Sequence, residues 1–147
     1  TLSEAMDLAE ITASVTHNHP EGIKGAKATA ALIYMGLHGF TFYQMSSFAD
    51  HFYDLNFSID GIRKTYQFNE TCQDTVPQAI VAFLESTDYE DAIRNAISVG
   101  GDSDTLACIT GSIAGAYYGV PFEIQDKALS YLDPRLRAIY DDFVKTF

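Results

Sequence analysis

Apolar and small residues recur every three or four positions along most of the chain, which is the spacing of the buried face of a helix. The clearest such segment runs from Pro20 to Leu37, where they occupy Ile23, Ala26, Ala30, Ile33, Tyr34 and Leu37. Because most of its other positions are also small or apolar, we expect this helix to be buried on several sides.

The same spacing predicts helices in most of the remaining chain, and local signals give their limits. We expect Ser3 to cap a first helix that ends near Val15, and apolar residues between 45 and 53 mark a third helix. Capping boxes at 75–78 and 87–90 precede two further helices, and Gly100 with Gly101 ends the second of them. Helices from about 103 to 118 and from about 123 to 132 follow, and Pro134 opens the last one.

The segment 59–73 gives the least clear signal. Its residues 62–68 show a partial alternation, which is compatible with a short strand or with an extended loop. The chain contains no repeat, low-complexity tract or internal linker. The sequence therefore predicts one all-α domain over residues 1–147.

Charge and composition narrow the functional classes. The net charge of −11 over 147 residues argues against binding to nucleic acid or to an anionic membrane, because phosphates would be repelled. No apolar run is long enough to span a bilayer. The two cysteines, Cys72 and Cys108, fit neither a disulfide framework nor a zinc site, and we expect Cys108 to be buried in a helix. We therefore expect a cytoplasmic protein.

An Asp-Ser-Asp-Thr run follows the Gly100–Gly101 pair at the predicted start of a helix. Asp102, Asp104 and Thr105 would present two carboxylates and a hydroxyl, the hard oxygens that suit Mg²⁺, Mn²⁺ or Ca²⁺. Acidic residues at a helix start are also common caps, so capping and metal binding both remain open. An EF-hand is excluded, because its sixth and twelfth positions counted from Asp102 would be alanine and isoleucine instead of glycine and glutamate.

Two histidines, His17 and His19, lie in the predicted loop before residue 20. They could bind a metal, act as acid and base, or contact a ligand, and they could equally satisfy backbone groups at the helix junction. Glu21 could be catalytic, but an acid in the first turn of a helix is expected without any such role.

Two stretches resemble the ADP-ribosylglycohydrolase family: THNHPEGIKGAKATA, and GGDSDTLACITGSIAGAYYG with the proline that follows it. The resemblance implies an all-α orthogonal bundle around a binuclear magnesium or manganese site, and removal of ADP-ribose from modified side chains or small ADP-ribosyl compounds. It implies that Asp102, Asp104 and Thr105 are metal ligands and that His17 lines the ADP-ribose cleft. Gly100, Gly101 and Ser103 would border the same cleft through their backbone.

The sequence also departs from the family. The remaining metal ligands of the family lie in an N-terminal half, in a Thr-Asp-Asp element that this chain does not contain, together with a catalytic acidic residue. We therefore expect the chain to correspond to the C-terminal portion of a family member, with an incomplete bundle and a weak Mg²⁺ site.

Two functional alternatives follow from this departure. The complete protein is expected to hydrolyse ADP-ribosyl linkages; the alternative is an inactive fragment or an inactive module that binds ADP-ribose or has a structural, crystallin-like role. Exposed small-residue helices lead us to expect self-association or a complementing N-terminal half.

Overall fold

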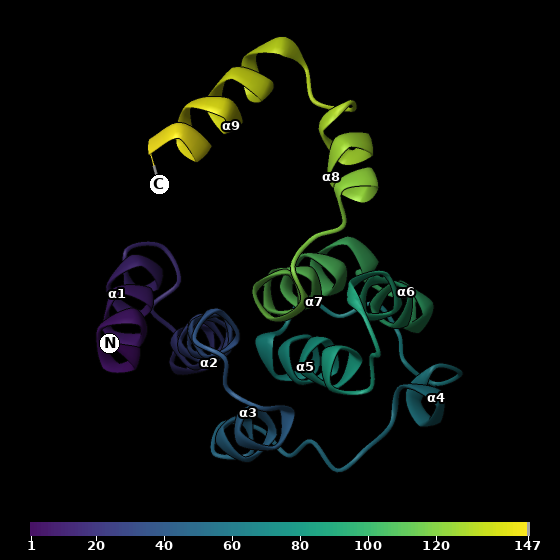
Figure 1. Cartoon of the computed structure of the whole chain (residues 1–147). Helices are drawn as coiled ribbons and strands as arrows, with labels where there is room; N and C mark the ends of the chain where they lie inside the picture. Colours follow the sequence, from purple (N-terminus) through teal and green to yellow (C-terminus); the bar gives the residue numbers. More distant parts are fainter. Residues whose placement is uncertain (147) are drawn as a thin grey trace.

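Residues 1–146 are described by the computed structural model, and they form nine α-helices and one 3₁₀ turn without any strand (Figure 1). This confirms the predicted all-α fold class. The elements are α1 (Leu2–Ser14), α2 (Pro20–Leu37), α3 (Phe42–Ala49), α4 (Ile59–Ile62), η1 (Cys72–Asp74), α5 (Val76–Leu84), α6 (Tyr89–Val99), α7 (Ser103–Tyr118), α8 (Phe122–Leu129) and α9 (Pro134–Thr146).

Helix α2 lies between α1 and α7 and also contacts α3 and η1 (Figure 1). This confirms the expectation that it is buried on several sides. Near its C-terminus, Gly36 lies against the backbone of Ala116 and Tyr117 in α7, and nearer its N-terminus Ala30 and Ile109 line one groove. Residue numbers along the contact therefore rise in the same direction in both helices, so α2 and α7 run parallel.

The core consists of two clusters joined through α5 and α7. The larger cluster contains Leu32 and Met35 of α2, Phe83 of α5 and Ile113 of α7; the smaller contains Val81, Val99 and Leu106, among others. Thr110 is fully buried, and its Oγ1 donates to the carbonyl oxygen of Ala79 at 2.9 Å. This bond satisfies the polar group and joins α7 to α5.

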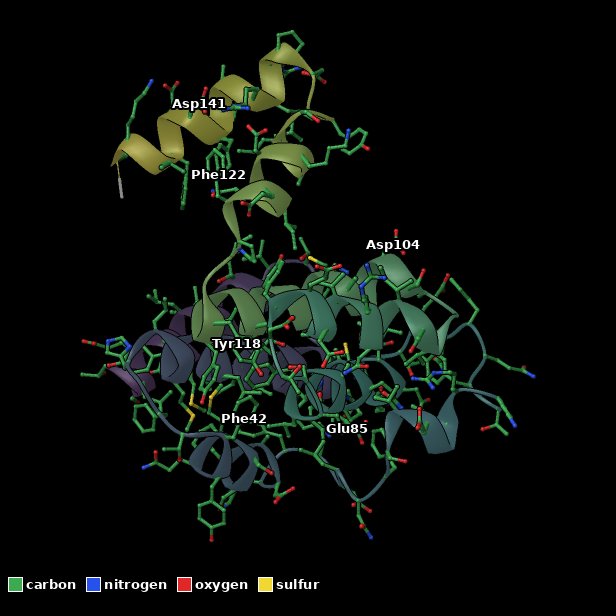
Figure 2. All side chains as sticks on the ribbon, turned by 45° about the vertical axis from the view of Figure 1, so that its right-hand side comes forward. Phe42, Glu85, Asp104, Tyr118, Phe122 and Asp141 are labelled. Atoms are coloured by element: carbon green, nitrogen blue, oxygen red, sulfur yellow. The ribbon has the colours of Figure 1, made fainter. Side chains whose placement is uncertain are left out.

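Aromatic rings close one side of the larger cluster. Phe42 stacks on Phe83 with centroids 5.0 Å apart and meets Tyr117 edge-on at 4.5 Å. Figure 2 shows Phe42 below Tyr118, and the two ring centroids are 6.0 Å apart. These contacts attach the short helix α3 to the α5–α7 pair.

Small residues on α7 allow α6 to approach closely, since Ala107, Gly111 and Gly115 recur at every fourth position. A Cβ built at Gly111 would lie 2.8 Å from Cδ1 of Ile93 in α6. A Cβ at Gly115 would lie 3.6 Å from the ring of Tyr89. The first half of α6 therefore packs closely against the middle and C-terminal turns of α7.

Three predicted helix caps are wrong. Thr1, and not Ser3, caps α1 in a capping box with Glu4. Thr75 makes no capping bond, because its Oγ1 donates to the carbonyl oxygen of Asn69. The cap of α6 is one residue later than predicted: the Asp88 carboxylate accepts from the N–H of Asp91 at 2.8 Å.

Cys108 is exposed, which contradicts the expectation that it is buried. It lies on a face of α7 that no other described helix covers. The segment 59–73 forms the short helix α4, a loop and the start of η1, so of the two alternatives the strand is wrong and a loop is found after α4.

Helices α8 and α9 extend away from the body formed by the other helices (Figure 1). Neither helix contains a buried residue. Exposed apolar side chains include Phe122, Tyr131, Leu136 and Ile139. Within residues 1–146, no helix combines the length and the apolar character needed to cross a membrane.

Candidate functional site

The turn between α6 and α7 carries the candidate metal ligands. Gly100 and Gly101 have φ values of +80° and +62°, which side chains with a Cβ rarely adopt, and they reverse the chain direction after α6. Asp102 then occupies the N-cap position of α7, yet its side chain makes no capping hydrogen bond. The capping interpretation therefore does not account for the Asp102 carboxylate.

The Asp102 and Asp104 carboxyl groups lie close together. A hydrogen bond shared with the Asp102 carboxyl lowers the pKa of Asp104, and the backbone N–H groups of Asp104 and Thr105 act in the same direction. Asp104 and Thr105 are exposed and Asp102 is half-buried. Figure 2 shows the Asp104 side chain pointing away from the helical body. The start of α7 thus presents the exposed carboxyl group of Asp104 beside the half-buried one of Asp102, and Asp104 also interacts with the helix terminus.

Tyr66, which the sequence did not single out, packs on this turn. A Cβ built at Gly101 would lie only 2.7 Å from Cε1 of the Tyr66 ring. Burial raises the pKa of Tyr66, and the negative charges of Asp74 and Asp102 add to this effect. The ring is therefore a close neighbour of the candidate ligands, although it lies 35 residues earlier in the chain.

The two histidines have different surroundings. His19 is the N-cap of α2, and its Nδ1 accepts from the N–H of Glu21 at 3.2 Å. The junction role left open by the sequence is therefore correct for His19. His17 is exposed in the loop between α1 and α2, with its Nδ1 2.8 Å from Oγ1 of Thr16.

Parallel packing places the two predicted parts of the site at the same end of a helix pair. His17 precedes the N-terminus of α2, and Gly100–Thr105 forms the N-terminus of α7. Asp102 and Asp104 come together directly, whereas the hydrogen-bond partner of the His17 ring among residues 1–146 is Thr16. Ser103 is the first residue of α7, beside this carboxyl pair.

Glu21 and Lys24 form an ion pair of 2.6 Å on the first turns of α2. The Lys24 ammonium also lies over the Tyr53 ring, 4.6 Å from its centroid. This pairing gives Glu21 a structural partner and matches the interpretation of Glu21 as an ordinary first-turn acid.

The donor set at the start of α7 fits a hard divalent cation by its chemistry: two adjacent carboxylates, one of them without a capping role, and a nearby hydroxyl. Among the described residues, no three His, Cys, Asp or Glu side chains gather in an arrangement that could hold a metal. The candidate set therefore supplies only part of a coordination sphere.

Comparison with known proteins gives this geometry its context. A family model described as ADP-ribosylglycohydrolase matches residues 1–147. An uncharacterised protein of Archaeoglobus fulgidus is 30% identical over 125 residues, which are 74% of this chain and 41% of that protein. The ADP-ribosylarginine hydrolase Tri1 of Pseudomonas putida is 28% identical over 123 residues, 73% of this chain and 31% of its own.

The ADP-ribosylhydrolase ARH3 of Homo sapiens is 41% identical over 58 residues, 32% of this chain and 16% of that protein. No solved structure matches the chain significantly. The matched regions cover less than half the length of each of these curated relatives. Because the family model matches the whole sequence, the chain belongs to the ADP-ribosylglycohydrolase family.

Proposed function

We propose that this chain supplies one side of a divalent-metal and ADP-ribose site in a protein that hydrolyses ADP-ribosyl linkages. The observation that carries the proposal is the pair of neighbouring carboxyl groups of Asp102 and the exposed Asp104, which follows the Gly100–Gly101 turn. Membership of the ADP-ribosylglycohydrolase family supports this interpretation of the pair.

Each residue of the site has a role that suits its chemistry. Asp102, Asp104 and Thr105 would hold Mg²⁺ or Mn²⁺ through hard oxygen atoms. The bound metal would supply positive charge that orients ribose hydroxyls and water and stabilises charge developed as the bond to the anomeric carbon breaks.

The backbone and the histidine loop would bind the rest of the substrate. The N–H groups of Gly101 and Ser103 lie at the N-terminus of a long helix, where the helix dipole favours a diphosphate. Gly100 would border the substrate through its Cα, because its N–H donates to the carbonyl oxygen of Ile97 at 3.1 Å. His17 would contact the ADP-ribose from the loop at the same end of the α2–α7 pair. Such backbone contacts are needed because the net charge of −11 repels a diphosphate elsewhere on the chain.

The names of the relatives share the ADP-ribosyl group and differ in the rest of the substrate: the P. putida protein is named for ADP-ribosylarginine, and the human protein for ADP-ribose alone. The proposal therefore extends to the ADP-ribosyl group, attached to a protein side chain or to a small compound.

A catalytically inactive module that binds ADP-ribose is the second candidate. One observation favours it: the described residues gather two carboxylates and a hydroxyl at the site, whereas octahedral Mg²⁺ takes six ligands. This candidate predicts binding of ADP-ribose without turnover, whereas the first predicts turnover in the complete protein.

Calorimetry with ADP-ribose, with and without Mg²⁺, tests the site. We expect metal-dependent binding to this chain and its loss in the double variant Asp102→Asn, Asp104→Asn. A matched control is Asp141→Asn, Asp142→Asn, which removes the same charge from the distant helix α9 (Figure 2). Failure to bind in either condition, or equal losses in the two double variants, would contradict the proposed site.

A further inference from the structure

The turn that carries the candidate ligands has few internal restraints: the N–H of Gly100 donates to the carbonyl oxygen of Ile97 at 3.1 Å, and the N–H of Leu106 donates to that of Asp102 at 3.0 Å. Two consecutive glycines, Gly100 and Gly101, give its backbone a wide range of accessible conformations. The side chain of Asp102 adds no capping hydrogen bond that would fix the start of α7. The position of the carboxyl pair therefore depends on contacts from other parts of the chain.

Tyr66 provides the closest such contact. A Cβ at Gly101 would lie 2.7 Å from Cε1 and 3.2 Å from Cδ1 of the Tyr66 ring, and 3.3 Å from the carbonyl oxygen of Gln67. Only glycine fits in this space without a shift of the ring. The glycine turn thus packs directly against the Tyr66 ring and the backbone of Gln67.

The segment that carries Tyr66 is itself held by hydrogen bonds. The Tyr66 hydroxyl donates to the carbonyl oxygen of Asp74 at 2.7 Å, where η1 ends. Asn69 donates to the Asp74 carboxylate at 2.9 Å, which ties the intervening loop together. On the other side, Nε of Arg63 donates to Oγ of Ser98 at 3.0 Å, near the end of α6. Residues 63–74 therefore contact the chain at two places: at the end of α6, just before the glycine turn, and at Gly101 within the turn.

We infer that Tyr66 is a positioning residue, whose ring holds the Gly100–Gly101 turn so that the Asp102 and Asp104 carboxyl groups stay together for a divalent cation. This inference rests on the proposed function for the identity of the ligands. Tyr66 acts through Gly101 and does not itself bind the metal. A residue that orients metal ligands typically changes metal affinity by about tenfold or more when it is removed.

Three variants separate positioning from general stabilisation. Tyr66→Ala removes the ring, Tyr66→Phe keeps the ring and removes the hydroxyl, and Tyr131→Ala is a control at a tyrosine that is 76% exposed on the α8–α9 segment. Two quantities are measured on the whole chain: amide hydrogen exchange of residues 100–105 without metal, and Mn²⁺ affinity by electron paramagnetic resonance.

For Tyr66→Ala we expect faster exchange confined to the turn and a loss of Mn²⁺ affinity of about tenfold. Tyr66→Phe should restore most of the affinity, and Tyr131→Ala should match the wild type. Unchanged exchange at 100–105, exchange that rises equally in all helices, or unchanged Mn²⁺ affinity in Tyr66→Ala would each overturn the inference. If Asp102→Asn, Asp104→Asn left Mn²⁺ binding intact, the proposed function would fail instead, which distinguishes the two failures.

Discussion

Replacement of Gly36 by alanine tests whether the α2–α7 contact is as close as the structure shows. A Cβ at position 36 would lie 3.1 Å from the backbone nitrogen of Tyr117 and 3.2 Å from both the carbonyl carbon and the Cβ of Ala116. Because two of these three atoms belong to the backbone of α7, the contact is relieved only if the two helices separate.

Two opposing contributions set the size of the effect. Alanine stabilises a helix by up to about 1 kcal/mol relative to glycine. An extra methyl group in a tightly packed interface costs about 1–3 kcal/mol. We therefore expect Gly36→Ala to lower the free energy of unfolding by about 1 kcal/mol, as the difference of these two contributions.

Gly111→Ala is the matched control on the other side of α7. Its Cβ would meet Cδ1 of Ile93 at 2.8 Å, but that atom is the end of a flexible side chain that can rotate away. Urea unfolding followed by circular dichroism measures both variants. We expect Gly111→Ala to be closer to the wild type than Gly36→Ala. The opposite order, or a Gly36→Ala chain more stable than the wild type, would refute the close backbone contact.

Five other measurements test the fold and the association state. Thr110→Val should lower the free energy of unfolding by about 1–2 kcal/mol, because the buried hydrogen bond to Ala79 is lost; an unchanged urea midpoint would contradict this. Tyr53→Phe should preserve stability or raise it by about 1 kcal/mol, because among residues 1–146 the buried Tyr53 hydroxyl has no hydrogen-bond partner. Burial also raises the pKa of Tyr53, so deprotonation favours the unfolded chain, and wild-type stability should fall as the pH rises above about 10, less so in Tyr53→Phe. Asp133→Ala removes the carboxylate that accepts from two N–H groups at the start of α9, and should speed amide exchange there and leave the core unchanged. Light scattering at high concentration tests the expected self-association, which a strictly monomeric chain would contradict.

The helix limits that could be predicted are those fixed by local chemistry. The predicted ranges 20–37 and 103–118 agree with α2 and α7 to the residue, because Pro20 starts one helix and Gly119, at φ +78°, ends the other. Both signals act within a few residues of the boundary, so the sequence alone contains them.

The helix caps show where local patterns fail. A threonine and a glutamine three residues apart predicted a box at Thr75, but the Thr75 hydroxyl donates to Asn69 in a loop whose path the local sequence does not specify. At α6 the predicted box was Thr87 with Glu90, whereas in the structure the Asp88 carboxylate accepts from the N–H of Asp91. Tertiary context decides between such alternatives.

The candidate site also contains residues that a local sequence signal identifies and a residue that only a long-range contact identifies. Asp102 and Asp104 could be singled out because their residue types and spacing follow two glycines in one short run. Tyr66 could not, because its contact with Gly101 joins segments 35 residues apart and has no local signature. Cys108 was misplaced for a related reason: the helical pattern of α7 marks apolar positions but does not say which of them another helix covers.

Helix α7 explains why this site can exist beside a close-packed core. Its middle and C-terminal turns are engaged on several sides, by Gly36 of α2, by the Ala79 carbonyl of α5 and by Ile93 of α6. Small residues make these contacts possible, and the first turn contributes Leu106 to the smaller core cluster. Ser103, Asp104 and Thr105 lie outside the two core clusters, and the exposed carboxylate of Asp104 is carried by a helix that is held along its other turns. The glycine turn before it contacts the ring of Tyr66, the residue to which we assign the positioning of Asp102.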